Sequence, residues 1–150
     1  MYEKTRVLID GNDRVTILIV LDQISHNSSN PQTVIDPSTL KNTIPGFTAA
    51  NFRLTFLSAQ WCFDNQVSLV FLDTTPANSK AIVTSSNCGS IYVKIPNDTD
   101  VPDEGKIAYH THNGQSHGFL IATFMKERGF DFTGKRYRKQ NQPNPYLTNS

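Results

Sequence analysis

The chain has 150 residues, which is enough for one domain with a single core, because a domain of this length buries roughly two-thirds of the surface that its unfolded chain exposes. Nine Phe, five Tyr and one Trp stand among runs of Val and Ile, a composition typical of half-buried β-strands. No apolar run approaches the ~20 residues of a membrane-spanning helix, and no secretory leader opens the sequence. With only two cysteines, we expect a soluble protein made in a reducing cytoplasm.

The formal net charge of +1 conceals an uneven distribution. After Met125 the chain carries six basic and two acidic residues, a net charge of +4, so the first 125 residues carry −3. A basic C-terminal arm on a mildly acidic body indicates an acidic partner, which is either a nucleic acid or a protein surface.

Segments with strand signals follow one another along the chain, separated by Gly, Pro, Asn or Asp clusters. The nine candidate strands are residues 4–9, 14–22, 33–36, 52–63, 67–72, 81–84, 90–94, 106–112 and 118–126. No helical period extends beyond two turns, and no internal repeat is present. The pattern predicts an all-β fold, an antiparallel β-sandwich of jelly-roll or immunoglobulin-like type with about eight strands, over residues 1–127.

Turn residues predict how these strands are connected. Asp10-Gly11 begins a hairpin turn, because Asp-Gly between two apolar runs is a strong hairpin signal. Asp64-Asn65 is predicted to turn the chain into a second hairpin, and Asn87-Cys88-Gly89 is predicted to separate two further strands.

The apolar pattern also predicts burial. Residues 14–22 are apolar at both odd and even positions, so this segment is expected to be a central strand that is covered on both faces. Aromatic residues at strand positions are expected to form core rather than a ligand-binding box. These residues are Trp61, Phe63, Phe71, Phe119 and Phe124.

Residues 128–150 read as an extended basic arm, because the stretch from Asn141 to Pro145 contains two prolines and cannot continue a strand interior. The run Lys135-Arg136-Tyr137-Arg138-Lys139 could neutralise phosphates while its tyrosine stacks on a base. A basic arm on an acidic surface of a neighbouring subunit is the favoured interpretation. The predicted subunit contacts are Lys135, Arg136, Tyr137, Arg138, Lys139 and Tyr146 in the arm, and Asp98, Asp100, Asp103 and Glu104 in an acidic loop.

The sequence offers little for catalysis or cofactor binding. His110, His112 and His117 are candidates for a metal site, since alternate strand residues share a face, and the acidic loop is a candidate for calcium. Solvent-facing histidines and a solvated acidic loop are the favoured interpretations, and no metal or cofactor is expected. The acidic loop lacks the spacing of an EF-hand. No Gly-x-Ser-x-Gly motif or phosphate-binding loop occurs, and neither Cys62 nor Cys88 stands beside a base.

Six stretches of the sequence form a recognisable series, namely residues 11–15, 34–40, 53–61, 67–73, 105–111 and 119–126. In their order they resemble a family of small structural proteins of tailed-bacteriophage particles, β-sandwich subunits associated with decorated heads or necks. Two departures from the family pattern are Leu72-Asp73, where a Trp-Asp pair is common, and Lys106, which replaces an acidic residue. The resemblance covers about residues 6–126 and leaves out the arm.

The resemblance implies a non-enzymatic subunit of the virion, made in the host cytoplasm. We therefore expect a capsid decoration or cement protein whose partners are the major capsid protein and copies of itself. Nucleic acid, a small-molecule ligand and a membrane are not the expected partners. The alternatives are a neck or tail adaptor, a carbohydrate-binding module with Tyr92, Tyr109 and Tyr137 as its aromatic contacts, or a metal-dependent hydrolase that uses the three histidines.

Overall fold

A computed structural model of the chain describes residues 2–41, 52–73, 75–97 and 106–128. The seven strands are β1 (Tyr2–Asp10), β2 (Arg14–Ile24), β3 (Gln32–Ile35), β4 (Phe52–Phe71), β5 (Lys80–Ile95), β6 (Ile107–Thr111) and β7 (Ser116–Arg128), with short 3-10 turns η1 (Pro37–Thr39) and η3 (Pro76–Asn78). Every pair of neighbouring strands is antiparallel, which confirms the predicted all-β antiparallel fold. In the described part of the chain, no helix has the length and hydropathy that crossing a membrane requires.

Two pairs of predicted strands are single long strands, so nine candidates become seven. β4 continues through Asp64-Asn65 instead of turning back, and β5 continues through the predicted turn at Asn87–Gly89. The side chains at the first position explain the difference. Asp64 Oδ1 accepts the His117 N–H at 2.7 Å, and Asn65 Nδ2 donates to the Gln115 carbonyl at 3.1 Å. These hydrogen bonds connect β4 to the start of β7, and β4 bends at this point without reversing its direction.

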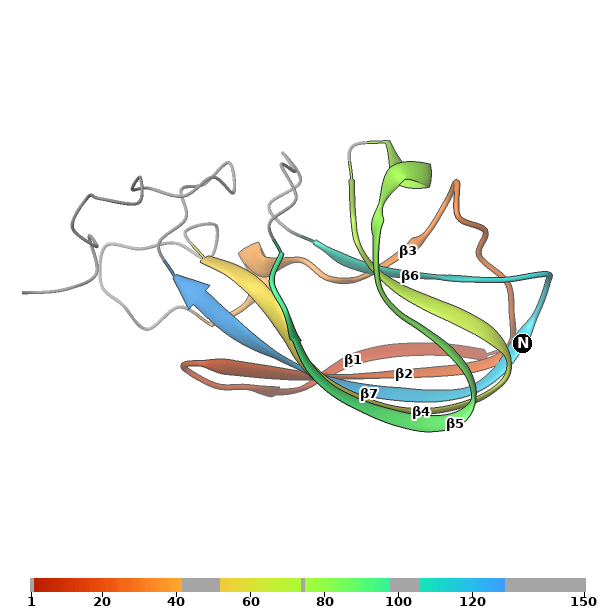
Figure 1. The fold of residues 1–150 in the computed structure, drawn as a ribbon, viewed down its shortest axis with the longest axis horizontal. Coiled ribbons are helices and arrows are strands. Elements are labelled where there is room, and N and C mark those ends of the chain that lie inside the picture. Colours follow the sequence, from red (N-terminus) through yellow and green to blue (C-terminus); the bar gives the residue numbers. More distant parts are fainter. Residues whose placement is uncertain (1, 42–51, 74, 98–105, 129–150) are drawn as a thin grey trace, which may run out of the picture.

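The bend in β4 folds one continuous sheet over on itself (Figure 1). Before the bend, β4 pairs with β7 and with the second half of β5; after it, β4 pairs with β6 and with the first half of β5. One part of the sheet, which we call the five-strand layer, has the order β1-β2-β7-β4-β5. The other, the four-strand layer, has the order β3-β6-β4-β5. The predicted sandwich of two separate sheets is thus, in this structure, one nearly closed barrel-like sheet.

The core lies between the two layers. β2 alternates as a half-buried strand should, with Val15, Ile17, Ile19 and Leu21 inside. Phe56 and Phe124 are fully buried and meet edge to face, with ring centroids 5.7 Å apart. Of the predicted core aromatics, Phe63, Phe71 and Phe124 are buried and Trp61 packs partly buried against the core. The prediction for Phe119 is wrong, because its parity on β7 turns it to the outer face.

Polar contacts close the barrel where β1 approaches β6. The carboxylate of Glu3 on β1 accepts a hydrogen bond from the buried hydroxyl of Tyr109 on β6, and it lies 3.0 Å from His26 Nε2. His26 is joined to Thr111 by its own backbone, since its carbonyl accepts the Thr111 N–H at 2.6 Å. The seam therefore connects β1, β6 and the chain after β2.

One cation is buried at the opposite end of the sheet. Lys126 occupies an inward position of β7, and its side chain is 0% exposed. The ammonium pairs with the Asp10 carboxylate and donates to the carbonyls of Gly11, at 2.7 Å, and Lys41, at 2.6 Å. These contacts hold the β1–β2 turn, and Lys41 in the segment after η1, against β7.

Candidate interaction surface

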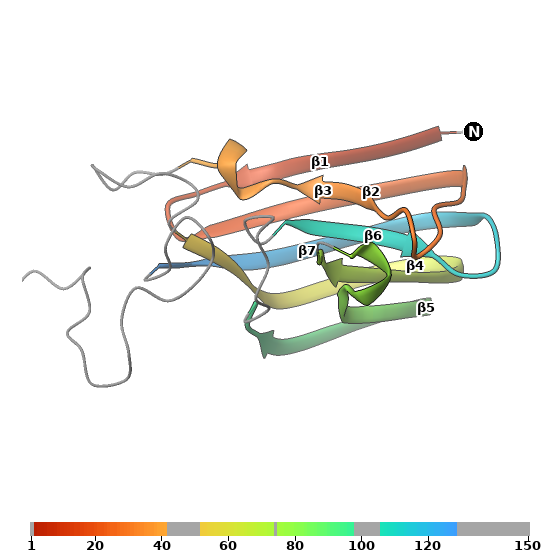
Figure 2. The ribbon, with the colours of Figure 1, turned by 90° about the horizontal axis from the view of Figure 1, so that it is seen from above.

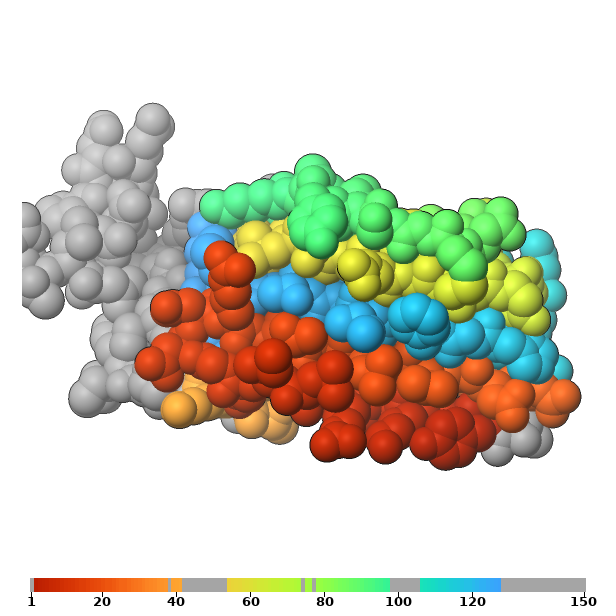
Figure 3. Space-filling model, turned by 90° about the horizontal axis from the view of Figure 1, so that it is seen from below, coloured from red at the N-terminus to blue at the C-terminus, as the bar shows by residue number. Residues whose placement is uncertain are grey.

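The outer face of the five-strand layer carries apolar side chains in register. Val20 on β2 stands opposite Phe119 on β7, and Phe119 stands opposite Cys62 on β4; one step along, Leu18 stands opposite Ile121. Phe119 is 39% exposed, and the other three apolar side chains are half-buried. Figure 3 shows this face, with β2, β7 and β4 side by side across its middle. We call Leu18, Val20, Phe119, Ile121 and the adjoining Cys62–Cys88 pair the apolar outer face.

Residues 14–22 are apolar on both faces, as the sequence indicates, but among the described residues only one of these faces is covered. The inner residues of β2 pack in the core, whereas Leu18 and Val20 have the outward parity and are half-buried. Figure 3 shows no described segment lying across β2 on this outer face. The four-strand layer can cover only one side of the sheet. An apolar sheet face with a polar surround is a mark of a protein–protein contact.

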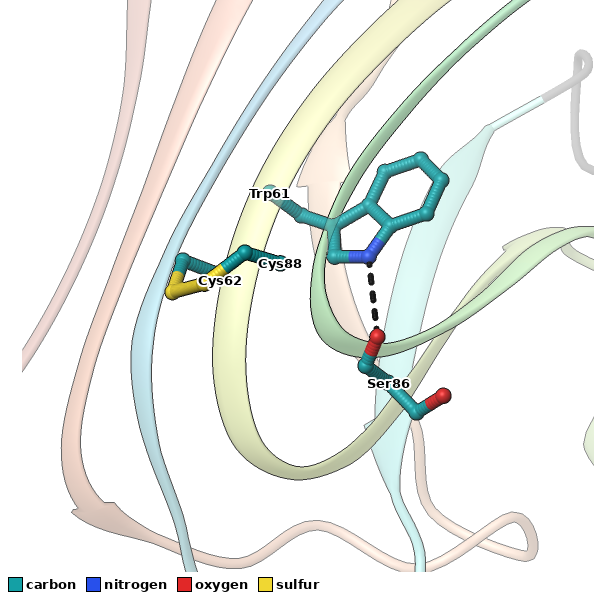
Figure 4. The surroundings of a disulfide bond; sticks show 4 residues. All are labelled: Trp61, Cys62, Ser86 and Cys88. Atoms are coloured by element: carbon teal, nitrogen blue, oxygen red, sulfur yellow. Dashed lines mark hydrogen bonds between the residues drawn. A yellow bond between two sulfur atoms is a disulfide. The ribbon is translucent and has the colours of Figure 1, made fainter.

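A disulfide joins the two strands at the margin of this face. Cys62 and Cys88 are direct partners in β4 and β5, with their Cα atoms 3.9 Å apart. The sequence interpretation placed Cys88 in a turn and so missed the pairing. In Figure 4 the disulfide and Trp61 point to opposite sides of β4. The indole donates to the Ser86 carbonyl at 3.4 Å.

The predicted histidine set is divided between two places. His110 and His112 lie on one face of the four-strand layer, with ring centroids 4.9 Å apart. His117 lies near the bend, where its Nδ1 is 2.8 Å from Asp64 Oδ2 and its Nε2 is 3.6 Å from Asp22 Oδ1. The structure therefore does not bring the three imidazoles together. Within the described residues, no three His, Cys, Asp or Glu side chains are placed to hold a metal ion.

The electrostatics at these histidines follow from their surroundings. Burial lowers the pKa of His110, and the nearby His112 adds to this effect. The backbone N–H of His117 stabilises the carboxylate form of Asp64 and lowers the pKa of that group, with the imidazole of His117 acting in the same direction.

A serine–histidine contact also occurs on the four-strand layer. Ser68 Oγ is 2.7 Å from His112 Nε2 and 2.9 Å from Thr84 Oγ1. Ser68 and Thr84 stand on the neighbouring strands β4 and β5, His112 directly follows β6, and Ser68 is only 2% exposed. A hydroxyl enclosed in this way cannot reach a substrate, so the contact is a cross-strand polar link rather than a nucleophile and its base.

Of the aromatic candidates for carbohydrate binding, the two that the structure describes, Tyr92 and Tyr109, do not share a surface. Tyr92 on β5 is 77% exposed, but Tyr109 is buried in the core, and this part of the prediction is wrong. Tyr109 is inward because it alternates with the outward-facing His110 on β6.

The predicted subunit contacts fall outside the described residues. This applies to Asp98, Asp100, Asp103 and Glu104, to the run from Lys135 to Lys139, which includes Tyr137, and to Tyr146. Of the arm, only Arg128 is described, and it ends β7. Comparisons of the chain with protein-family models, with curated proteins and with solved structures found no match.

Proposed function

We propose that this protein is a non-enzymatic structural subunit of a bacteriophage particle, a capsid decoration or cement protein that binds neighbouring subunits and stabilises the particle. The observation that carries the proposal is the apolar outer face. A folded domain that leaves Phe119 and its neighbours on one broad strand surface has a ready contact for another protein. The resemblance of the sequence to structural proteins of tailed-bacteriophage particles is our reason for assigning that contact to such a particle.

The composition of the apolar outer face suits a docking role. Aromatic side chains are enriched at the centres of protein–protein contacts, and a few central residues supply most of the binding free energy. Phe119 and Ile121 belong to a central strand of the sheet, so their positions are fixed before the partner arrives. A preformed contact loses little conformational entropy on binding.

The assignment of the fold to a class of β-sandwich is part of the same proposal. The layers of the bent sheet face each other as in a sandwich, and long strands that cross from one layer to the other are closer to a jelly roll than to an immunoglobulin domain, whose two sheets are separate. The arm after Arg128 is assigned to a neighbouring subunit, because its basic run complements an acidic protein surface.

The test is incorporation into particles. Particles assembled with Phe119→Asp in place of the wild-type protein should contain much less of the variant, because a carboxylate must be desolvated at the contact. Thr33→Asp, at an exposed position of β3, is the matched control and should be incorporated normally. Equal copy numbers of both variants in purified particles would refute the role of the apolar outer face. Normal incorporation of a chain ending at Arg128 would refute the role of the arm.

A neck or tail adaptor uses the same surface, and symmetry separates the two assignments. A decoration protein follows the icosahedral sites of the capsid, whereas a neck protein forms a ring. Labelling of the wild-type protein on intact particles locates it at one place or the other.

A further inference from the structure

The five-strand layer has two outer strands, β1 and β5, and they differ in how they would receive another strand. Figures 2 and 3 show them at opposite margins of the layer. Within the described residues, the only strand that pairs with β5 is β4, and the only one that pairs with β1 is β2. An open strand edge is a template for pairing with another chain unless charges or bulges block it.

The edge of β1 carries both features that prevent pairing, a bulge and charges. Its register with β2 shifts between Val7 and Ile9, so its regular part is Tyr2–Val7. Two cations, Lys4 and Arg6, lie on the outer face of that part. Pairing of two β1 strands about a two-fold axis sets Lys4 against Lys4, Lys4 against Arg6, or Arg6 against Arg6, depending on the register. Like charges directly opposite each other are destabilising.

β5 carries neither feature over its central part. Residues 88–92 pair with β4 without interruption, from Cys88 opposite Cys62 to Tyr92 opposite Ser58, whereas Asn87, just before them, has a positive φ of 55°. These five residues contain no charge and no proline. Their side chains are exposed except for that of Ile91, which is partly buried. An uncharged, regular and exposed edge of this length is the feature that protein surfaces ordinarily avoid.

We infer that β5 pairs with β5 of a second copy of this chain, antiparallel about a two-fold axis at Ser90. A two-fold axis perpendicular to the sheet keeps each face continuous, so residues opposite each other must share a face. With the axis at Ser90, Gly89 stands opposite the second copy's Ile91, and Cys88 stands opposite its Tyr92. The indole of Trp61 already covers the inner side of Gly89, so the cross-strand contact that favours this register is the one on the outer face, where the aromatic ring of Tyr92 meets the disulfide sulfur. An axis at Gly89 would leave two glycines facing each other.

Strand direction argues against a head-to-tail alternative. β1 and β5 run the same way, because four antiparallel steps separate them. Joining β5 of one copy to β1 of the next by a rotation that preserves direction would require parallel pairing, which is slightly less stable per residue. It would also use the charged and bulged edge of β1. The two-fold pairing through β5 avoids both costs.

The inference deepens the proposed function by naming the surface that joins copies of this chain, and rests on that function only for the setting in which the dimer works. The two tests are separate. Self-association is measured on the purified full-length protein, whereas the proposed function is measured by incorporation into particles.

The first experiment is disulfide trapping. Ser90→Cys places one thiol from each copy beside the axis, where directly opposed residues have Cβ atoms roughly 4.5–5.5 Å apart. After air oxidation, this variant should run as a covalent dimer on a non-reducing gel. Lys94→Cys, on the same strand, is the control and should remain a monomer, because the two thiols would be about 26 Å apart at the rise of a β-strand. A dimer of Lys94→Cys with no dimer of Ser90→Cys overturns the register.

The second experiment is sedimentation equilibrium of the otherwise native protein. The wild type should be a dimer, and Ser90→Lys should raise the dissociation constant by about tenfold or more, since it sets two ammonium groups against each other at the axis. Thr33→Lys adds the same charge to the four-strand layer and should dimerise like the wild type. A monomeric wild type at the highest attainable concentration overturns the inference, as does a ring of more than two copies.

Discussion

Replacing the buried Lys126 with Met tests the polar contacts that hold the β1–β2 turn against β7. Methionine keeps most of the methylene packing but has no ammonium group. The carbonyls of Gly11 and Lys41 then lose a donor, and the Asp10 carboxylate loses its cation. Removing one partner of a buried ion pair typically costs 3–5 kcal/mol, because the other charge stays behind without compensation.

We expect a loss of about 3 kcal/mol, at the low end of that range. Asp10 is 27% exposed and keeps a second hydrogen bond, from the Lys41 N–H at 2.6 Å, so part of its charge remains solvated. For a domain of this size, 1 kcal/mol corresponds to a shift of about 2–4 °C in Tm, so the transition should fall by about 6–12 °C.

The assay is thermal and urea unfolding of Lys126→Met beside Lys4→Met. Lys4 is exposed on β1, so its substitution should change the free energy of unfolding by less than about 0.5 kcal/mol. In the double variant Asp10→Asn and Lys126→Met, no bare carboxylate remains, and the loss should be smaller than in the single variant. If Lys126→Met is as stable as Lys4→Met, the buried ammonium does not hold the turn and the reasoning fails.

Two further predictions concern the bend and the histidine pair. A Cβ on Gly118 would lie 1.9 Å from the Cys62 carbonyl oxygen, so Gly118→Ala should destabilise the protein by about 3 kcal/mol or more. Gly114 also has a positive φ but has open space around it, so Gly114→Ala should lower the free energy of unfolding by only about 1 kcal/mol. Equal losses for the two variants in urea unfolding would contradict the steric argument. Because the folded-state pKa of His110 lies below its ordinary value of 6.5, the stability present above that value should decrease as the pH falls through the folded-state pKa. His110→Gln should flatten this dependence in urea unfolding from about pH 8 to about pH 5, and an unchanged slope would show that another group is responsible.

Strand positions were predictable because they depend on local alternation and on turn residues. Residues 14–22 and 118–126 lie within β2 and β7 as expected, and the Asp10-Gly11 signal stands between β1 and β2. The predicted hairpin at Asp64 was wrong for a reason that lies outside the local sequence. An Asp-Asn pair can close a turn or bind a neighbouring strand, and the second outcome occurs here because Gln115 and His117, far away in the sequence, lie beside the pair.

The surface was harder to predict than the strands. A segment that is apolar on both faces indicates contact on both sides, but not whether the second contact lies within the chain. In this protein the inner residues of β2 lie in the core, and we propose that the outer ones contact another molecule. The cysteine pairing was missed for a related reason, since Cys62 and Cys88 become neighbours only because β4 and β5 run together as one long hairpin through the bend.

The two edges of the five-strand layer, taken with its outer face, constrain how the protein could assemble. A strand edge that pairs about a two-fold axis is fully paired after one contact, so β5 can join only two copies of the chain. The cations and the bulge of β1 stop further growth at the other margin. Such a dimer cannot extend into a fibre through the two edges of the five-strand layer. Its two apolar outer faces would be joined into one continuous surface, because the axis keeps both on the same side. We expect this combined surface to contact the larger partner together with the arm, so Ser90→Lys should weaken binding to the partner as well as dimerisation.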